Sequence, residues 1–129
     1  MRAVDTDILV RYLTNDDASQ AARARRLLDR EQVLVPLTVL LETEWVLRGV
    51  YGFAPPQVIA ALRGFVGLEH VVVENPATAA IALDWAERGL DFADALHLAV
   101  ARSHDGFISF DKGLARAARK AGAPPVEEP

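Results

Sequence analysis

Short apolar runs alternate along the chain with longer segments whose apolar residues recur at helical spacing. The short runs predict four strands, over residues 2–5, 32–36, 69–75 and 106–111. The longer segments predict seven helices, over residues 6–14, 16–31, 38–52, 54–67, 76–89, 91–105 and 112–122. The proline-bounded tail, residues 124–129, has room for one short edge strand around Val126.

The order of these elements predicts an α/β fold. The strands are short and apolar throughout, and each is followed by a helix, which is typical of a parallel sheet with helices on both faces. A chain of 129 residues is long enough for one such core, so we expect a single domain over residues 1–129.

Composition removes several classes of protein. The chain has no cysteine, which excludes a disulfide scaffold, a thiolate metal site and a cysteine nucleophile, and agrees with a reducing compartment. Its longest apolar stretch is too short to cross a bilayer, so we expect a soluble cytoplasmic protein with no membrane partner. The net charge of −4 gives no global sign of a nucleic-acid partner.

The positive charges are nevertheless clustered. Arg23, Arg26 and Arg30 recur at helical spacing, and four more cations crowd the last predicted helix, residues 112–122. Solvated helix faces are the simplest interpretation of both groups. Helices of this kind can also hold a polyanion around an acidic site.

Four acidic residues occur where buried residues are expected. Asp5 follows the first predicted strand and Asp111 follows the fourth, while Glu42 and Asp94 lie inside apolar helices. Parallel sheets bind ligands outside the carboxyl ends of their strands, where Asp5 and Asp111 fall. Carboxylates among apolar residues need a helix to cap, a cationic partner or a metal ion.

Helix capping is the plainer interpretation for the acids at helix starts. Asp5 or Asp7 can cap the first predicted helix, Asp91 the helix that contains Asp94, and Asp111 the last helix. Each capping role is about as plausible as a functional one when it is taken singly.

Helical geometry limits which acids can act together. Glu42 and Glu44 are two residues apart and point to nearly opposite sides of their helix, and the apolar pattern does not choose between them. Asp91 and Asp94 are three residues apart and share a face. His97, on the same helix as Asp94, is expected to be a structural residue.

A convergence of the four acids would require a counter-charge, because like charges packed together cannot all stay ionised. Oxygen ligands without cysteine favour Mg²⁺ or Mn²⁺ over zinc. Such an ion can activate water and stabilise the charge that grows on a phosphate.

Four segments in order resemble PIN-domain ribonucleases, specifically the toxins of VapBC toxin–antitoxin pairs. They are "VDTDILVRYLTNDDASQA", "VPLTVLLETEWVLRGVYG", "LDFADALHLAVA" and "FISFDKGLAR". The resemblance implies a three-layer α/β/α sandwich around a central parallel sheet. It also implies Mg²⁺- or Mn²⁺-dependent cleavage of structured RNA, often tRNA or ribosomal RNA, together with a VapB-type antitoxin and a toxin homodimer.

Carried over by position, the resemblance assigns the site residues. It makes Asp5, Glu42, Asp94 and Asp111 the catalytic acids and favours Glu42 over Glu44. Asp5, Asp94 and Asp111 are the expected metal ligands, with Glu42 either a ligand or the residue that orients the attacking water. The expected accessory residues are Thr6, Asp91 and Ser109.

The sequence departs from the family pattern at Asp7, where members commonly have asparagine. A further carboxylate there can strengthen metal binding or cap the helix as asparagine does. We expect Asp7 to act as the cap.

Three other functions are weighed against this one. A haloacid-dehalogenase-type phosphatase would use Asp5 as nucleophile, but the only acids after Lys112 are Glu127 and Glu128 in the tail. A receiver domain needs an aspartate after the third strand, where only Glu74 is present. A PIN-like module that binds RNA or protein without catalysis remains the alternative.

Overall fold

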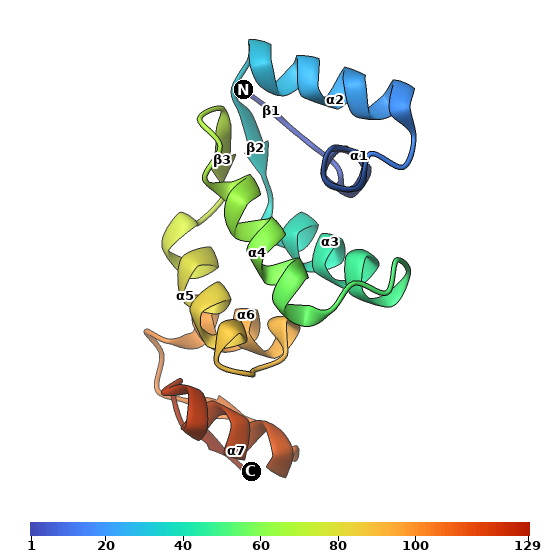
Figure 1. Cartoon of the computed structure of the whole chain (residues 1–129). Coiled ribbons are helices and arrows are strands. Elements are labelled where there is room, and N and C mark those ends of the chain that lie inside the picture. The colour runs from blue at the N-terminus through green and yellow to red at the C-terminus, as the bar shows by residue number, and fades with distance from the viewer. The chain divides into compact units, whose positions relative to one another are not determined.

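The computed structural model describes all 129 residues and divides into two compact units, Met1–Pro76 and Ala77–Pro129. Each unit combines helices with a small sheet of its own, and Figure 1 labels the helices and strands β1 to β3. Every pair of adjacent strands is parallel, as predicted. None of the helices has both the length and the apolar character that crossing a membrane requires.

The first unit is built around a three-stranded sheet in the order β1-β2-β3. Its elements are β1 (Arg2–Ala3), α1 (Thr6–Thr14), α2 (Ala18–Arg30), β2 (Val33–Val35), α3 (Leu37–Gly49), α4 (Pro55–Val66) and β3 (Val71–Val73). The central strand β2 pairs Leu34 with Ala3 on one side and with Val72 on the other. Valines fill β2 and β3 because β-branched side chains pack well on a pleated surface.

The core of the first unit holds α1 against α3 and so fixes the start of α1. Leu9 of α1, Leu40 of α3 and Phe65 of α4 are almost fully buried. The ring of Tyr12 meets that of Phe65 edge-on, with 5.5 Å between ring centroids. The residues that precede α1 therefore lie at a defined place beside α3.

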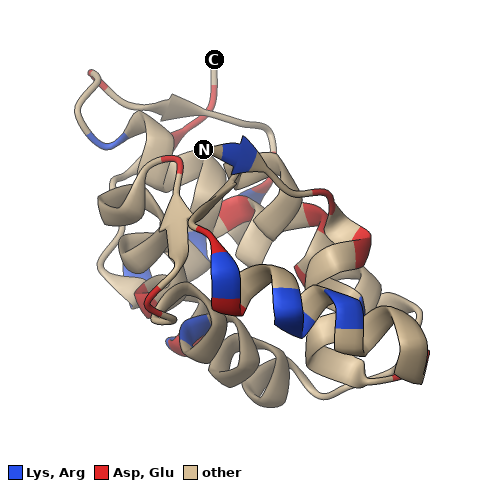
Figure 2. Ribbon diagram, turned by 90° about the horizontal axis from the view of Figure 1, so that it is seen from above, with Lys and Arg blue, Asp and Glu red and all other residues tan.

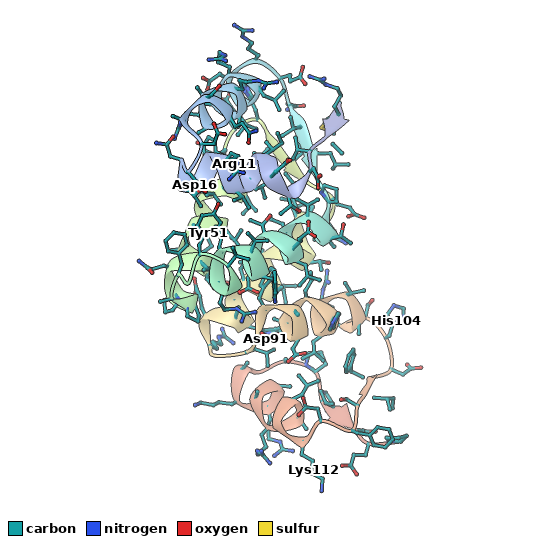
Figure 3. The ribbon with its side chains drawn as sticks, turned by 90° about the vertical axis from the view of Figure 1, so that its right-hand side faces the viewer. Arg11, Asp16, Tyr51, Asp91, His104 and Lys112 are labelled. Carbon is teal, nitrogen blue, oxygen red and sulfur yellow. The ribbon has the colours of Figure 1, made fainter.

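A network of polar side-chain hydrogen bonds stabilises the turn between α1 and α2. Asn15 ends α1 in the left-handed conformation, and Asp17 caps α2 by accepting a hydrogen bond from the Gln20 N–H. The Tyr51 hydroxyl donates to Asp16 at 2.9 Å and accepts from Arg11 at 3.3 Å. Figure 3 labels the side chains of Arg11, Asp16 and Tyr51 in this network.

The second unit contains a two-stranded parallel sheet. Its elements are α5 (Pro76–Glu87, starting at the boundary residue), α6 (Phe92–Ala101), β4 (Phe107–Ile108), α7 (Lys112–Ala121) and β5 (Val126–Glu127). Strands β4 and β5 pair Phe107 with Val126 and Ile108 with Glu127, and α7 is the crossover between them. Arg88 donates to the carbonyl of Ala121 at 2.9 Å, which satisfies one of the free carbonyls at the end of α7.

The predicted elements are confirmed, including the edge strand near Val126, which is β5. Several ends differ. The helix predicted over 38–52 runs from Leu37 to Gly49, and Pro36 is at its N-cap position, without a side-chain hydrogen bond. The helix predicted over 91–105 ends at Ala101.

Candidate functional site

Asp5 lies at the carboxyl end of β1, where the chain turns into α1. The backbone of Val4 still bonds to the sheet, its N–H donating to the Leu34 carbonyl at 3.0 Å. Asp5 is extended and caps α1, and its carboxylate accepts a hydrogen bond from the Thr6 N–H at 2.7 Å. Its side chain is exposed, so its remaining lone pairs are available to a ligand.

The Thr6 hydroxyl joins this strand end to α3. It is nearly buried and donates a hydrogen bond to the carboxylate of Glu42, which is exposed on α3. Asp5, Thr6 and Glu42 thus form one group in the first unit. Thr6 orients the Glu42 carboxylate while Asp5 starts the helix that carries Thr6.

Glu44, two residues further along α3, faces elsewhere. It is only 3% exposed and accepts a hydrogen bond from the Arg48 Nε at 2.8 Å. This ion pair occupies Glu44, whereas Glu42 accepts the hydrogen bond from Thr6, the residue after Asp5.

The expectation that Asp7 caps the first helix is wrong. Asp7 is the second residue of α1 and is exposed in its first turn, and Asp5 has the N-cap position. The cause is the early end of β1 at Ala3, which leaves Asp5 as the last extended residue before the helix. Asp7 still lies where a negative charge interacts favourably with the helix dipole.

Two acids of the second unit cap the helices that follow them. Asp91 caps α6 by accepting from the Asp94 N–H at 3.3 Å, and Asp111 caps α7 by accepting from the Leu114 N–H at 3.0 Å. The Ser109 hydroxyl oxygen accepts from the Asp111 N–H at 3.0 Å and so holds the turn between β4 and α7.

Asp94 experiences both burial and negative charge. Burial is the main cause that raises the pKa of its carboxyl. The charge of Asp91 and, more weakly, that of Asp111 raise it further, while His97 lowers it. Asp91, Asp94 and Asp111 are therefore electrostatic neighbours within the second unit. His97 itself is exposed.

Gly113 is a further residue of this region that the sequence did not single out. A Cβ atom at this position would lie 3.2 Å from the Asp111 Oδ1 atom, tighter than an ordinary contact. The lack of a side chain therefore leaves the Asp111 carboxylate room. A glycine two residues after an acid at a helix start was the only signal of this role.

A comparison with protein-family models shows what this arrangement belongs to: the model described as PIN domain matches residues 2–120. The chain belongs to the PIN domain family. A search of curated proteins found no match. The PIN domain match extends through both compact units and confirms the predicted fold class, since the helices and parallel strands fit a three-layer α/β/α PIN-like fold.

PIN domains are commonly metal-dependent nucleases, so the oxygen atoms of this one that could bind a metal ion are relevant to its function. The donor set consists of carboxylates and hydroxyls, which suits a hard divalent cation such as Mg²⁺ or Mn²⁺. The pKa of Asp94 is raised by burial and, to a lesser degree, by the neighbouring carboxylates of Asp91 and Asp111, whose charge a cation would offset. In the present arrangement no three His, Asp or Glu side chains form a group that could hold a metal ion.

A surface hollow of about 600 Å³ opens beside Asp5 in the first unit of the PIN domain. Asp5, Asp7 and Glu31 contribute its negative charge, and Arg2, Arg11 and Arg23 its positive charge. The exposed Asp5 carboxylate is therefore accessible from a cavity with mixed charge.

Proposed function

We propose that this PIN domain is an Mg²⁺- or Mn²⁺-dependent endoribonuclease, the VapC-type toxin of a type II toxin–antitoxin pair, acting in the cytoplasm on structured RNA such as tRNA or ribosomal RNA. The observation that carries the proposal is the position of its acids. In each unit a carboxylate lies in the turn after a parallel strand: Asp5, whose neighbour Thr6 donates a hydrogen bond to Glu42, and Asp111, which interacts electrostatically with Asp94.

The proposal requires that the two pairs of acids meet in one site. Asp5 and Asp111 each follow the carboxyl end of a parallel strand, which is where α/β sheets bind their ligands.

The residues would divide the chemistry among them. Asp5, Asp94 and Asp111 would hold the divalent cation, which when bound supplies Lewis acidity toward water and phosphate. Glu42, oriented by the Thr6 hydroxyl, would align the attacking water and take its proton. The water oxygen bonds to phosphorus as the P–O3′ bond breaks, which leaves a 5′-phosphate and a 3′-hydroxyl.

The accessory residues would keep these groups in place. Asp91 holds the first turn of α6, on which Asp94 lies, and Ser109 holds the turn that presents Asp111. Thr6 does the same for Glu42. Loss of a residue that holds a metal ligand in place typically changes metal affinity or activity about 10- to 100-fold.

The proposed protein partners are a cognate VapB-type antitoxin and a second copy of the chain. Helices α3 and α4 are both rich in apolar residues, which can serve the core or a contact with another protein. On α4 that surface is core, since Val58, Leu62 and Phe65 are buried, whereas Trp45 and Val50 at the end of α3 are exposed. A chain that stays monomeric in light scattering and binds no protein encoded beside it would contradict both partners.

The test is cleavage of tRNA and ribosomal RNA by the wild type, Asp5→Asn and Asp94→Asn, with Mg²⁺ or Mn²⁺ and with chelator. Asparagine caps a helix as well as aspartate does, so Asp5→Asn removes the charge and keeps the start of α1. We expect each variant to lose at least about 100-fold in rate, because a cation contributes several kcal/mol to the transition state.

Asp105→Asn is the matched control, since it removes one exposed carboxylate from a loop outside the proposed site and should leave the rate unchanged. Undiminished cutting by Asp5→Asn or Asp94→Asn, or in chelator, would contradict the assignment. A folded wild type that binds RNA or protein and cuts nothing with either metal would instead favour the non-catalytic module.

A further inference from the structure

One face of α2 presents three arginines that no acid neutralises. Arg23, Arg26 and Arg30 follow at intervals of three and four residues, so they lie on the same side of the helix. All three are exposed, and none forms an ion pair or a side-chain hydrogen bond in the structure. We refer to these three residues as the α2 arginine face.

The other arginine in the middle of α2 behaves differently. Arg25 points away from this face, donates to the Asn15 side-chain oxygen at 3.3 Å and lies 5.7 Å from the centre of the Tyr12 ring. It has a structural role in the contact between α1 and α2. The α2 arginine face has no comparable role.

The α2 arginine face leads toward Asp5. All three of its arginines line a hollow of about 350 Å³ that also contains Arg2. Arg23 and Arg2 in turn line the larger hollow that contains Asp5. Figure 2 shows the blue bands of α2 near the blue strand at the N-terminus.

The charge of this face is unbalanced in a chain that is acidic overall. The acid in the same hollow, Glu31, is already paired with Arg2, whose Nε donates to it at 2.9 Å. Like charges at this helical spacing repel one another, and a polyanion would relieve the repulsion. From Arg23 to Arg30 the helix rises about 10 Å, which gives room for more than one phosphate group.

We propose that the α2 arginine face binds the sugar–phosphate backbone of the RNA and leads it to Asp5. This inference rests on the proposed function, which makes RNA the substrate. Guanidinium groups match phosphate oxygens in a two-pronged hydrogen bond, so arginine suits this task better than lysine. Contacts of this kind position the strand without reading its sequence.

The test measures binding without cleavage. Fluorescence anisotropy of a labelled tRNA, in chelator and over a range of salt, compares the wild type with the triple variant Arg23→Gln, Arg26→Gln, Arg30→Gln. Losing three phosphate contacts should lower the slope of log affinity against log salt by about 2 and weaken binding about 100-fold at 0.1 M salt. Circular dichroism checks that both proteins are folded.

The matched control removes the same charge from α7, with Arg116→Gln, Arg119→Gln and Lys120→Gln, all exposed. A smaller loss from the α7 variant supports the inference. An equal loss from both would show that affinity follows net charge and would overturn it. An α2 variant that binds RNA as the wild type does, whether or not it loses an acidic protein partner, would overturn it too.

The two proposals can fail separately. If the α2 variant loses RNA binding while Asp94→Asn still cleaves RNA, the binding face stands and the proposed metal site fails. If Asp94→Asn is inactive and the α2 variant binds RNA normally, the reverse holds. A wild type that binds no RNA at all in chelator would overturn the binding face.

Discussion

The acids of the first unit and those of the second are held in different ways. Asp5 and Glu42 each accept a hydrogen bond from Thr6, one from its backbone and one from its hydroxyl. In the second unit Asp94 is half-buried beside Asp91 and Asp111, and its pKa is raised.

The difference separates two requirements of a metal site. Hydrogen bonds to carboxylates fix where ligands point without a metal, which is the condition of Asp5 and Glu42. Burial first, and then neighbouring carboxylates, disfavour the ionised form of Asp94, and protonation or a cation would offset that cost. We therefore expect the second unit to contribute most to metal affinity and the first unit to contribute most to orientation.

The largest expected effect is stabilisation by metal. Mn²⁺ at 100 times its dissociation constant should raise the free energy of unfolding of the wild type by about 2.7 kcal/mol, because the ion binds only the folded state. Asp94→Asn should abolish this gain, while Glu42→Gln should keep at least half of it. Thermal unfolding with Mn²⁺ and with chelator measures both, and an equal loss in the two variants would remove the distinction between the units.

A smaller effect separates the two glutamates of α3. Glu44→Gln should lower the free energy of unfolding by about 1–2 kcal/mol, because it removes a charge-assisted hydrogen bond from a buried side chain. Glu42→Gln, on the exposed side, should change it by less than about 0.5 kcal/mol. Urea unfolding in chelator compares them, and a Glu42→Gln loss as large as that of Glu44→Gln would show that Glu42 is held for stability.

The smallest effect is a dependence on pH without metal. The pKa of Asp94 in the folded protein is raised above its ordinary value of 3.8, so the protonated carboxyl favours folding. Its contribution is complete below pH 3.8 and is lost as the pH rises through the raised folded pKa. The free energy of unfolding of the wild type relative to Asp94→Asn should therefore decline over that range in chelator. A flat or rising difference would show that Asp94 is not electrostatically strained.

The sequence alone predicts the helices and strands, because each of them has a local sequence pattern of its own. The valine run of residues 71–73 predicts a strand, Pro55 fits the start of a helix, and even the tail strand near Val126 is foreseeable. The ends are less certain. Two aspartates two residues apart, Asp5 and Asp7, are both good caps, and the length of β1 decides between them.

The sequence predicts the site only in part, because local patterns do not determine which side chains meet in the folded protein. Apolar neighbours surround both Glu42 and Glu44, so the hydrophobic pattern cannot rank them, although Arg48 four residues after Glu44 was an available sign of an ion pair. The hydrogen bond from Thr6 to Glu42 depends on how α1 packs on α3, which no local pattern encodes. The meeting of Asp5 and Glu42 with Asp94 and Asp111 stays a prediction for the same reason.

Three of the acids proposed for the site also cap helices: Asp5, Asp91 and Asp111. The capping role limits which substitutions these positions can accept during evolution. A descendant that no longer needs the proposed nuclease activity would still need a short polar residue at each helix start. Decay should then exchange these aspartates for asparagine, serine or threonine, while Asp94, which caps nothing, drifts freely. The residues at positions 5, 91, 94 and 111 of a related sequence would then distinguish a protein that has lost the proposed activity from one that retains it.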